Sequence, residues 1–510
     1  MTVNIKINPV FCLACGAVCA FYCLFPVFRR GLVNINLFLV LAFIPVTVLC
    51  LFRVLASYPL LADHNPRTSR LIRLMPVWLT AFSAGLALGI GAGVQADSGV
   101  SFGIPENTVT GISGTLLDDP RSISGGRVMS ALSLRMVSGS GGVRATARGE
   151  VTVFFLEESA DRLREFGRGA EVFADGSLRA GTGGFEGVYT FGAENLHITK
   201  SAPPLERFRT GLRLGLTRRF TGLAEDSADA SWGGLALALL LGIRDNLDTG
   251  FSLMYREAGC SHILALSGMH LAVLIAIISF LLKKPLGLRP AAITGAFIII
   301  AYCFIVGPLP SLNRAALMYL LGVLAVLGML KRDPLLLLCM AFLIQLVFSP
   351  QAGFSLSFIL SYPALAGILI IGDLINNIFK GTVPAIVLQS VSASLGAFIA
   401  TAAVSSWFFN DLRPVGIIAG LVMAPLTMVF MAGSMVWLGL DLLHPALSFP
   451  LGKPLSLLYK LMEKAVSLAS YIPGIRLNFF VVLASSLLIT GLLVWLDYRR
   501  RLVIHPEPFT

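Results

Sequence analysis

Charged side chains are scarce in this sequence of 510 residues, of which 13% are charged and 56% are hydrophobic. A soluble globular domain carries about 25% charged residues. The shortage excludes an ordinary soluble protein and predicts a polytopic α-helical membrane protein with about ten spans.

Signatures of ATP hydrolysis and of metal binding are also missing. No phosphate-binding loop of the form GxxxxGK[ST] occurs, and there is no HEXXH or clustered Cys/His pattern. Histidine itself is rare, with six in the whole chain. We therefore expect no ATP motor, no metal, no cofactor and no enzymatic activity.

Cysteine is absent from residues 97–205, which excludes a disulfide within that segment. The eight cysteines lie in or beside apolar runs. Cys15, Cys19 and Cys23 recur every four residues and so share one helix face. We interpret them as small packing residues, because a metal site would require histidine or carboxylate neighbours.

Charge is distributed unevenly along the chain. Residues 97–205 carry 10 basic and 13 acidic side chains, whereas the remainder carries 29 and 15. Arg53, Arg67, Arg70 and Arg73 make the connection before the third apolar run basic. By the positive-inside rule this connection is cytoplasmic, which places residues 97–205 on the opposite side of the membrane.

Apolar runs and composition divide the chain into five parts. We expect a three-span unit at 1–96, a β-rich domain at 97–204, an amphipathic interfacial helix at 205–230, a membrane core at 231–498 and a short tail at 499–510. The first unit has apolar runs near 9–28, 32–52 and 74–96. In the core, 232–243 is too short to span, and a broken or re-entrant helix is expected within 414–440, which contains Pro425.

Residues 97–204 alternate between apolar and polar side chains in five stretches, at 109–117, 127–137, 145–155, 170–178 and 188–198. A short amphipathic helix is predicted at 159–166, between the third and fourth stretches. Three strands, a helix and two strands match the order of a five-stranded OB-like barrel. Some OB folds bind single strands of nucleic acid, but the net negative charge argues against autonomous binding here.

The segment 205–220 has apolar residues every three or four positions, with arginines over much of the remaining surface. This pattern is typical of a helix that lies in the membrane interface. Anchoring to lipid is one interpretation and gathering of a polyanion is the other. The candidate surface contacts are Arg207, Arg213, Arg218 and Arg219.

The apolar stretch from Ala258 to Leu282 carries unusual polar groups, at His262, Ser267 and His270. Polar groups in hydrocarbon are costly unless they are paired or face a hydrated path. Gly268 after Ser267 predicts a helix break. The pattern indicates either a wet passage or a helix-packing motif whose polar groups are satisfied internally.

Two further segments place polar groups at the start of apolar helices. In 307–321, prolines precede Asn313 and Arg314, and Arg314 could extend to the interface or toward a phosphate. In 349–365, Ser355 and Ser357 begin a helix kinked by Pro363. Hydrogen bonding between helices is the alternative role for these serines.

These three segments, in this order and behind a β-rich insert, resemble the ComEC family of competence DNA-uptake channels. The resemblance covers residues 97–440 and is strongest in Gly259–His270, which is similar to the family pattern GxxHLLAISGLH. The Arg314 segment and the S-L-S-F at 355–358 support it. The acidic residue that the family places after 239–242 stands at Asp245.

The resemblance implies a channel of the bacterial inner membrane that passes single-stranded DNA into the cytoplasm, with the OB-like domain outside. Membrane lipid and a separate DNA receptor, motor and nuclease are the expected partners, and pairing of two copies stays open. No HxHxDH nuclease signature occurs, so nuclease activity is not assigned. The path would be lined by His262, Ser267, Gly268, His270, Asn313, Arg314, Ser355 and Ser357.

Two other functions fit parts of the sequence. A small-molecule or lipid transporter with a related core would normally show repeated halves, and none are visible. An intramembrane serine hydrolase is suggested by Ala265–Gly268, which approaches GxSG with a histidine available as base. The first glycine of that motif is missing, however, and His270 is only three residues from Ser267.

Overall fold

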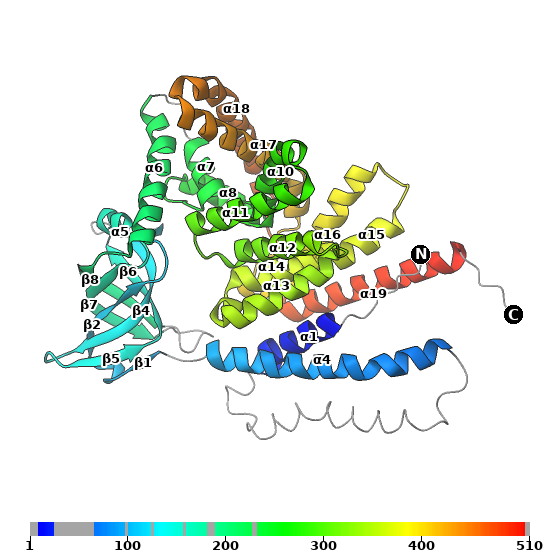
Figure 1. Ribbon diagram of the computed structural model, residues 1–510, viewed down its shortest axis with the longest axis horizontal. Coiled ribbons are helices and arrows are strands. Elements are labelled where there is room, and N and C mark those ends of the chain that lie inside the picture. The colour runs from blue at the N-terminus through cyan, green and yellow to red at the C-terminus, as the bar shows by residue number, and fades with distance from the viewer. Residues whose placement is uncertain are drawn as a thin grey trace. The chain divides into compact units, whose positions relative to one another are not determined.

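The computed structural model describes residues 9–24, 66–96, 100–123, 127–156, 160–180, 189–226 and 232–504. The chain forms two compact units, Met1–Ser98 with Leu317–Leu369, and Gly99–Ala316 with Ile370–Thr510. Figure 1 labels their elements. The predicted span at 32–52 lies outside the described residues.

The first unit is a bundle in which small residues allow helices to approach closely. It contains α1 (Pro9–Val18), η1 (Cys19–Leu24), α4 (Pro66–Ala96), α13 (Pro334–Phe348), η5 (Pro350–Phe354) and α14 (Leu356–Gly367). A methyl group at Gly85 would collide with the carbonyl oxygen of Leu13, so only glycine permits this α1–α4 contact. Such small-residue interfaces are typical of membrane helices.

The second unit begins with a closed barrel of five main strands, β2 (Val109–Leu116), β4 (Arg127–Gly139), β6 (Glu150–Leu156), β7 (Glu171–Ala180) and β8 (Tyr189–Lys200). Their pairing runs β2–β4–β6–β8–β7–β2, and only β6–β8 is parallel. Helix α5 (Ala160–Phe166) follows β6. This is the OB-type order that the alternation predicts.

The predicted third strand, 145–155, divides into β5 (Arg144–Arg148) and β6 at Gly149. Gly149 has φ +111°, a conformation that favours glycine, and the register of pairing with β4 shifts by one residue there. Strand β5 pairs with β4 and with the short β1 (Ser101–Phe102). The remaining short elements are η3 (Glu106–Thr108) and β3 (Arg121–Ile123).

Helix α6 (Pro204–Asp226) leads from the barrel into the membrane core. The core comprises α7 (Trp232–Leu241), α8 (Thr249–Glu257), α9 (Ser261–Leu264), α10 (Gly268–Leu286), α11 (Leu288–Val306), α12 (Pro310–Leu327), η6 (Ile368–Gly372), α15 (Asp373–Ile378), α16 (Ala385–Phe409), α17 (Val415–Leu443), α18 (Pro445–Ser470) and α19 (Phe479–Ile504). Helix α12 crosses the boundary between the units. All ten residues of α7 are buried, as its short apolar sequence predicts.

Eight helices among the described residues are long and apolar enough to span a membrane. The fold class is therefore confirmed: the chain is a multi-pass helical membrane protein with an inserted β-rich domain. Shorter apolar helices occur at Pro9–Tyr22, within the described part of the predicted span 9–28, and at Pro334–Phe348. A 15-residue helix such as α13 is about 22 Å long, less than the roughly 30 Å of a hydrocarbon core.

The expectation of a broken or re-entrant helix within 414–440 is wrong. Helix α17 continues through Pro425 for 29 residues. The chain instead reverses at His444, between the end of α17 and the start of α18. Helix α18 then packs against α17 as the second helix of a hairpin. Backbone hydrogen bonds between Leu412 and Ile475 bring the end of this hairpin back to its beginning. Helix α18 has no counterpart among the predicted spans, and it continues through Pro450 and Pro454.

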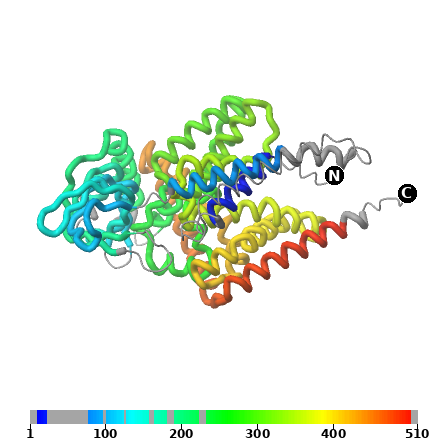
Figure 2. The backbone as a smooth tube through the Cα atoms, turned by 90° about the horizontal axis from the view of Figure 1, so that it is seen from below, coloured from blue at the N-terminus to red at the C-terminus, as the bar shows by residue number. Residues whose placement is uncertain are grey.

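Helices α16 and α19 lie side by side, as Figure 2 shows for the yellow-to-red part of the tube. The Ser406 hydroxyl at the end of α16 donates to the Leu477 carbonyl just before α19. At the other end, Arg500 donates to the carbonyl oxygens of Asn377 and Ile378. The two helices are therefore antiparallel.

Candidate functional site

The main candidate site is the interruption between α9 and α10. Ala265 and Ser267 have extended backbone there, so the chain does not continue as one helix from His262 to His270. Polar side chains bind two of the released carbonyls. The Ser311 hydroxyl donates to Leu266 O at 2.6 Å, and Arg244 donates to Leu264 O at 3.1 Å.

Ser267 and His270 form a reciprocal cap on the first turn of α10. The backbone N–H of Ser267 donates to Nδ1 of His270 at 3.1 Å, and the Ser267 hydroxyl lies 3.1 Å from the same nitrogen. His270 is fully buried, and its Nε2 atom has no hydrogen-bond partner. Because Nδ1 accepts a hydrogen bond, a neutral imidazole carries its proton on Nε2. One buried donor therefore remains available.

Arg314 brings a guanidinium group to the same helix end. A methyl group at Gly268 would lie 3.4 Å from Nη2 of Arg314, in van der Waals contact, so the guanidinium group lies beside the first residue of α10. Arg314 is buried, with 8% of its surface exposed. Asn313 is half-buried, and its backbone N–H donates to Leu309 O. The fold thus brings together Ser267, Gly268, His270 and Arg314.

The other predicted path residues belong to other segments of the chain. His262 is exposed on α9, on the far side of the chain break. Ser355 and Ser357 belong to the other unit. The Ser355 hydroxyl caps α14 by accepting from Phe358 N–H, and Ser357 is exposed.

The N-terminal end of α10 has a positive electrostatic potential. The unpaired N–H groups of a helix N-terminus carry about half a positive charge. Arg314 adds a full charge beside Gly268, and Arg244 adds another at the preceding turn. Anionic oxygens are the ligands that such a helix end accepts.

The Ser267–His270 distance of 3.1 Å is compatible with a serine nucleophile and its base. The detailed contacts favour a structural cap instead. His270 Nδ1 also accepts the backbone N–H of Ser267, and no described carboxylate or hydroxyl orients Nε2. The triad logic of hydrolases requires such a third group.

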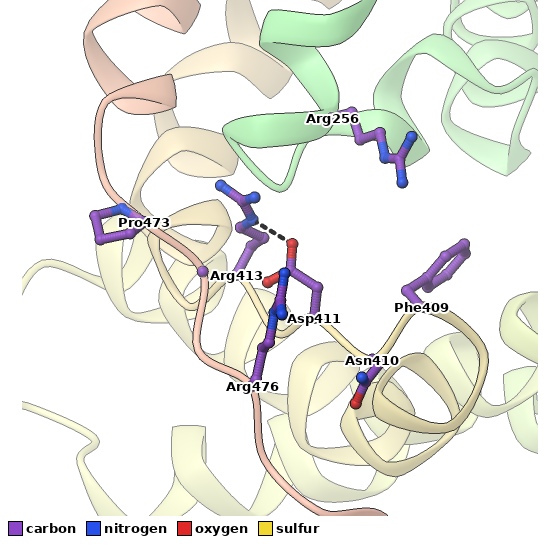
Figure 3. Close-up of a pocket in the computed structure, with 8 residues that line it drawn as sticks. Arg256, Phe409, Asn410, Asp411, Arg413, Pro473 and Arg476 are labelled. Atoms are coloured by element: carbon purple, nitrogen blue, oxygen red, sulfur yellow. Dashed lines mark hydrogen bonds and ion pairs between the residues drawn. The ribbon is translucent and has the colours of Figure 1, made fainter.

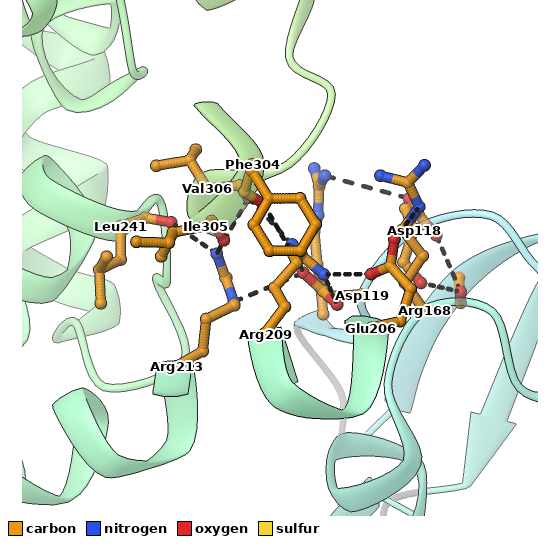
Figure 4. Close-up of polar contacts among 12 residues, drawn as sticks. Asp118, Asp119, Arg168, Glu206, Arg209, Arg213, Leu241, Phe304, Ile305 and Val306 are labelled. Carbon is orange, nitrogen blue, oxygen red and sulfur yellow. Dashed lines mark hydrogen bonds and ion pairs between the residues drawn. The ribbon is translucent and has the colours of Figure 1, made fainter. Parts of the chain in front are cut away.

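A second polar network joins α6 to the barrel and to α11, as Figure 4 shows. Arg209 has a 1% exposed side chain and pairs with Asp119 of the barrel at 2.5 Å. It also donates to the Phe304 carbonyl at 2.7 Å. Arg213 donates to the carbonyls of Ile305 and Val306 at 2.9 Å each. The two arginines thus bind carbonyls at the C-terminus of α11, where a positive charge is stabilising.

Asp119 is the carboxylate that balances these arginines. Burial alone would raise the pKa of its carboxyl group. The hydrogen bond from Arg209 and the charges of Arg213 and Arg209 outweigh this effect, so the pKa of Asp119 lies below its ordinary value. Asp119 is therefore ionised at neutral pH.

Of the four arginines predicted as surface contacts, Arg207, Arg218 and Arg219 are exposed. Arg219 also pairs with Asp441 of α17 at 2.6 Å. Arg213 has only 12% of its side chain exposed and contacts α11. A surface role therefore does not fit Arg213. The helical pattern identified α6 as amphipathic but could not distinguish an outward arginine from one that binds a neighbouring helix.

A family model described as Competence protein matches residues 239–502, slightly more than half of the chain. The chain belongs to this Competence family. The match includes the α9–α10 break and Arg314, so the candidate site lies within the family's characteristic region. It excludes the barrel and α6.

Two curated relatives were found. ComE operon protein 3 of Bacillus subtilis (strain 168) is 27% identical over 201 residues, which cover 38% of this chain and 24% of that protein. An uncharacterized protein of Aquifex aeolicus (strain VF5) is 28% identical over 208 residues, covering 40% and 48%. The chain thus matches less than half the length of either relative. No solved structure matches this chain.

Proposed function

We propose that this Competence-family chain passes single-stranded DNA across the bacterial cytoplasmic membrane during natural transformation. Family membership and the eight span-length helices support a role in DNA uptake. The barrel would lie on the outer side, because Arg67, Arg70 and Arg73 precede the third apolar run and the positive-inside rule favours the cytoplasm for them. The driving force, the DNA receptor and the nuclease would come from other chains.

One observation carries this proposal. The buried Ser267–His270 cap, the N-terminus of α10 and the guanidinium group of Arg314 lie together where the helix is interrupted, within an apolar bundle. A strand with one charge per phosphate needs donors and positive potential to cross hydrocarbon. Arg314, Nε2 of His270 and the first N–H groups of α10 are such donors. His262, Asn313, Ser355 and Ser357 complete the proposed path, and exposed Arg207, Arg218 and Arg219 would gather strands or lipid at the surface.

The proposal predicts that DNA interrupts ion current through the purified protein in a planar lipid bilayer. We expect Arg314→Gln to reduce the frequency of blockades by a 60-nucleotide oligo-dT at least tenfold, because a buried charge facing the strand is lost. Arg314→Lys should retain part of the blockade frequency, since lysine keeps the positive charge but lacks the planar guanidinium group that binds phosphate with two hydrogen bonds.

Arg289→Gln is the matched control, because Arg289 is exposed at the start of α11 and outside the proposed path. Blockade frequencies equal to wild type in both Arg314 variants would contradict the role of this site. Steady small-ion current that DNA never blocks in the wild-type protein would favour the small-molecule transporter.

A further inference from the structure

A basic pocket lies at the end of α16, apart from the α10 cap. Its cavity volume is about 490 Å³. It is formed by the last turn of α8 and by the α16–α17 and α18–α19 connections, as Figure 3 shows. Its lining residues are Arg256, Phe409, Asn410, Asp411, Arg413, Pro473, Gly474 and Arg476.

The pocket wall is built around Arg413. Its Nε atom donates to Asp411 at 2.8 Å, and its Nη1 donates to the Glu257 carbonyl at 2.9 Å. Arg413 thereby ties the end of α8 to the start of α17. A methyl group at Gly474 would collide with both Asp411 and Arg413, so glycine lets the α18–α19 connection close over the ion pair.

The remaining two guanidinium groups are not neutralised. Arg256 and Arg476 are exposed and form no ion pair with any carboxylate among the described residues. Asp411 is the only acidic residue that lines the pocket, and it forms an ion pair with Arg413. The pocket therefore presents two uncompensated positive charges to solvent.

These charges lie at the membrane face where basic residues are disfavoured. Arg500 is at the opposite end of the antiparallel α16–α19 pair, close to Lys380 on the connection before α16. The positive-inside rule assigns that end to the cytoplasm. Helix α16 has 25 residues and is about 37 Å long, enough to cross the bilayer. The arginine pocket then faces outward, so topology does not explain its charge.

We propose that this outward pocket binds phosphodiester groups of the DNA strand before the strand reaches the α10 cap; this rests on the proposed function. Guanidinium groups are planar donors that bind phosphate oxygens in pairs. The pocket also adjoins the predicted path, because Gly259 packs against Arg413 and Gly416 and is followed three residues later by the exposed His262.

The test compares wild type with Arg256→Gln/Arg476→Gln, which leaves the Arg413–Asp411 pair intact. The full chain is placed in nanodiscs of neutral phosphatidylcholine, and binding of fluorescein-labelled oligo-dT is measured by anisotropy at several salt concentrations. Each phosphate contact on a single strand contributes about 0.7 to the logarithmic salt slope. We expect about tenfold weaker binding at low salt and a slope smaller by about 1.4.

The control Arg289→Gln/Arg332→Gln removes the same charge at exposed positions outside the pocket and should bind as wild type does.

A second arm measures anionic phosphatidylglycerol retained by the purified protein, using native mass spectrometry. Loss of lipid without loss of oligonucleotide binding would overturn the assignment to DNA and give the pocket a lipid phosphate. Unchanged binding of both would overturn the pocket as a phosphate site. Failure of the wild-type protein to bind any oligonucleotide would instead contradict the proposed function.

Discussion

Individual arginines have three different roles in this protein, although they look alike in the sequence. Arg209 and Arg213 bind the carbonyls of a helix end, Arg413 ties connections together, and Arg256 and Arg476 remain open to solvent. The partner determines the role. No local pattern around Asp119 could reveal that it would lie opposite two buried arginines about 90 residues later.

The Asp119–Arg209 pair should make stability depend on pH. The pKa of Asp119 is lower in the folded than in the unfolded protein, so its contribution is complete above the unfolded value near 4 and is lost as the pH falls through the folded value. We expect Asp119→Asn to lower the melting temperature of the detergent-solubilised protein above about pH 5. The difference should shrink below about pH 4, and a difference that stays constant down to pH 3 would contradict this assignment.

The His270 cap is expected to stabilise the first turn of α10. His270→Ala removes the acceptor for Ser267 N–H, and a lost helix cap costs about 1 kcal/mol. We expect a measurable fall in melting temperature, partly restored in His270→Asn, whose side chain offers an acceptor. Exposed His197→Ala in the barrel is the matched control. No difference between His270→Ala and this control would argue against the cap.

Among the elements, strands and simple spans could be predicted because their patterns are local. The barrel strands follow the apolar–polar alternation to within a few residues, apart from the division at Gly149. Helices α17 and α18 could not be predicted in this way. Pro425 indicated a break, yet a membrane helix can accommodate proline when neighbouring groups compensate for the lost hydrogen bond.

The candidate site was only partly predictable for a related reason. Ser267, Gly268, His270 and Arg314 stood out because polar groups are costly in apolar runs. The arginine pocket did not, since Arg256 lies at the end of α8 and Arg413 and Arg476 lie in two separate connections, where basic residues are ordinary. Only the fold, through the Leu412–Ile475 backbone pairing, brings these connections together.

At the scale of the whole molecule, the antiparallel α16–α19 pair predicts which ends face the two sides of the membrane. Asn410→Cys and Lys380→Cys can be introduced separately after the eight native cysteines are replaced. We expect a membrane-impermeant maleimide to label position 410 in intact cells and position 380 only after permeabilisation. The opposite result would place the arginine pocket in the cytoplasm and remove it from the entry side.

The double attachment of Arg209, to Asp119 and to Phe304, has a mechanical consequence. The side chain of Arg209 thus links the barrel directly to the last turn of α11. A movement of the barrel would be transmitted to the glycine–proline segment at 307–310, which is followed four residues later by Arg314. We therefore expect a ligand that displaces the barrel to alter the surroundings of Arg314 as well.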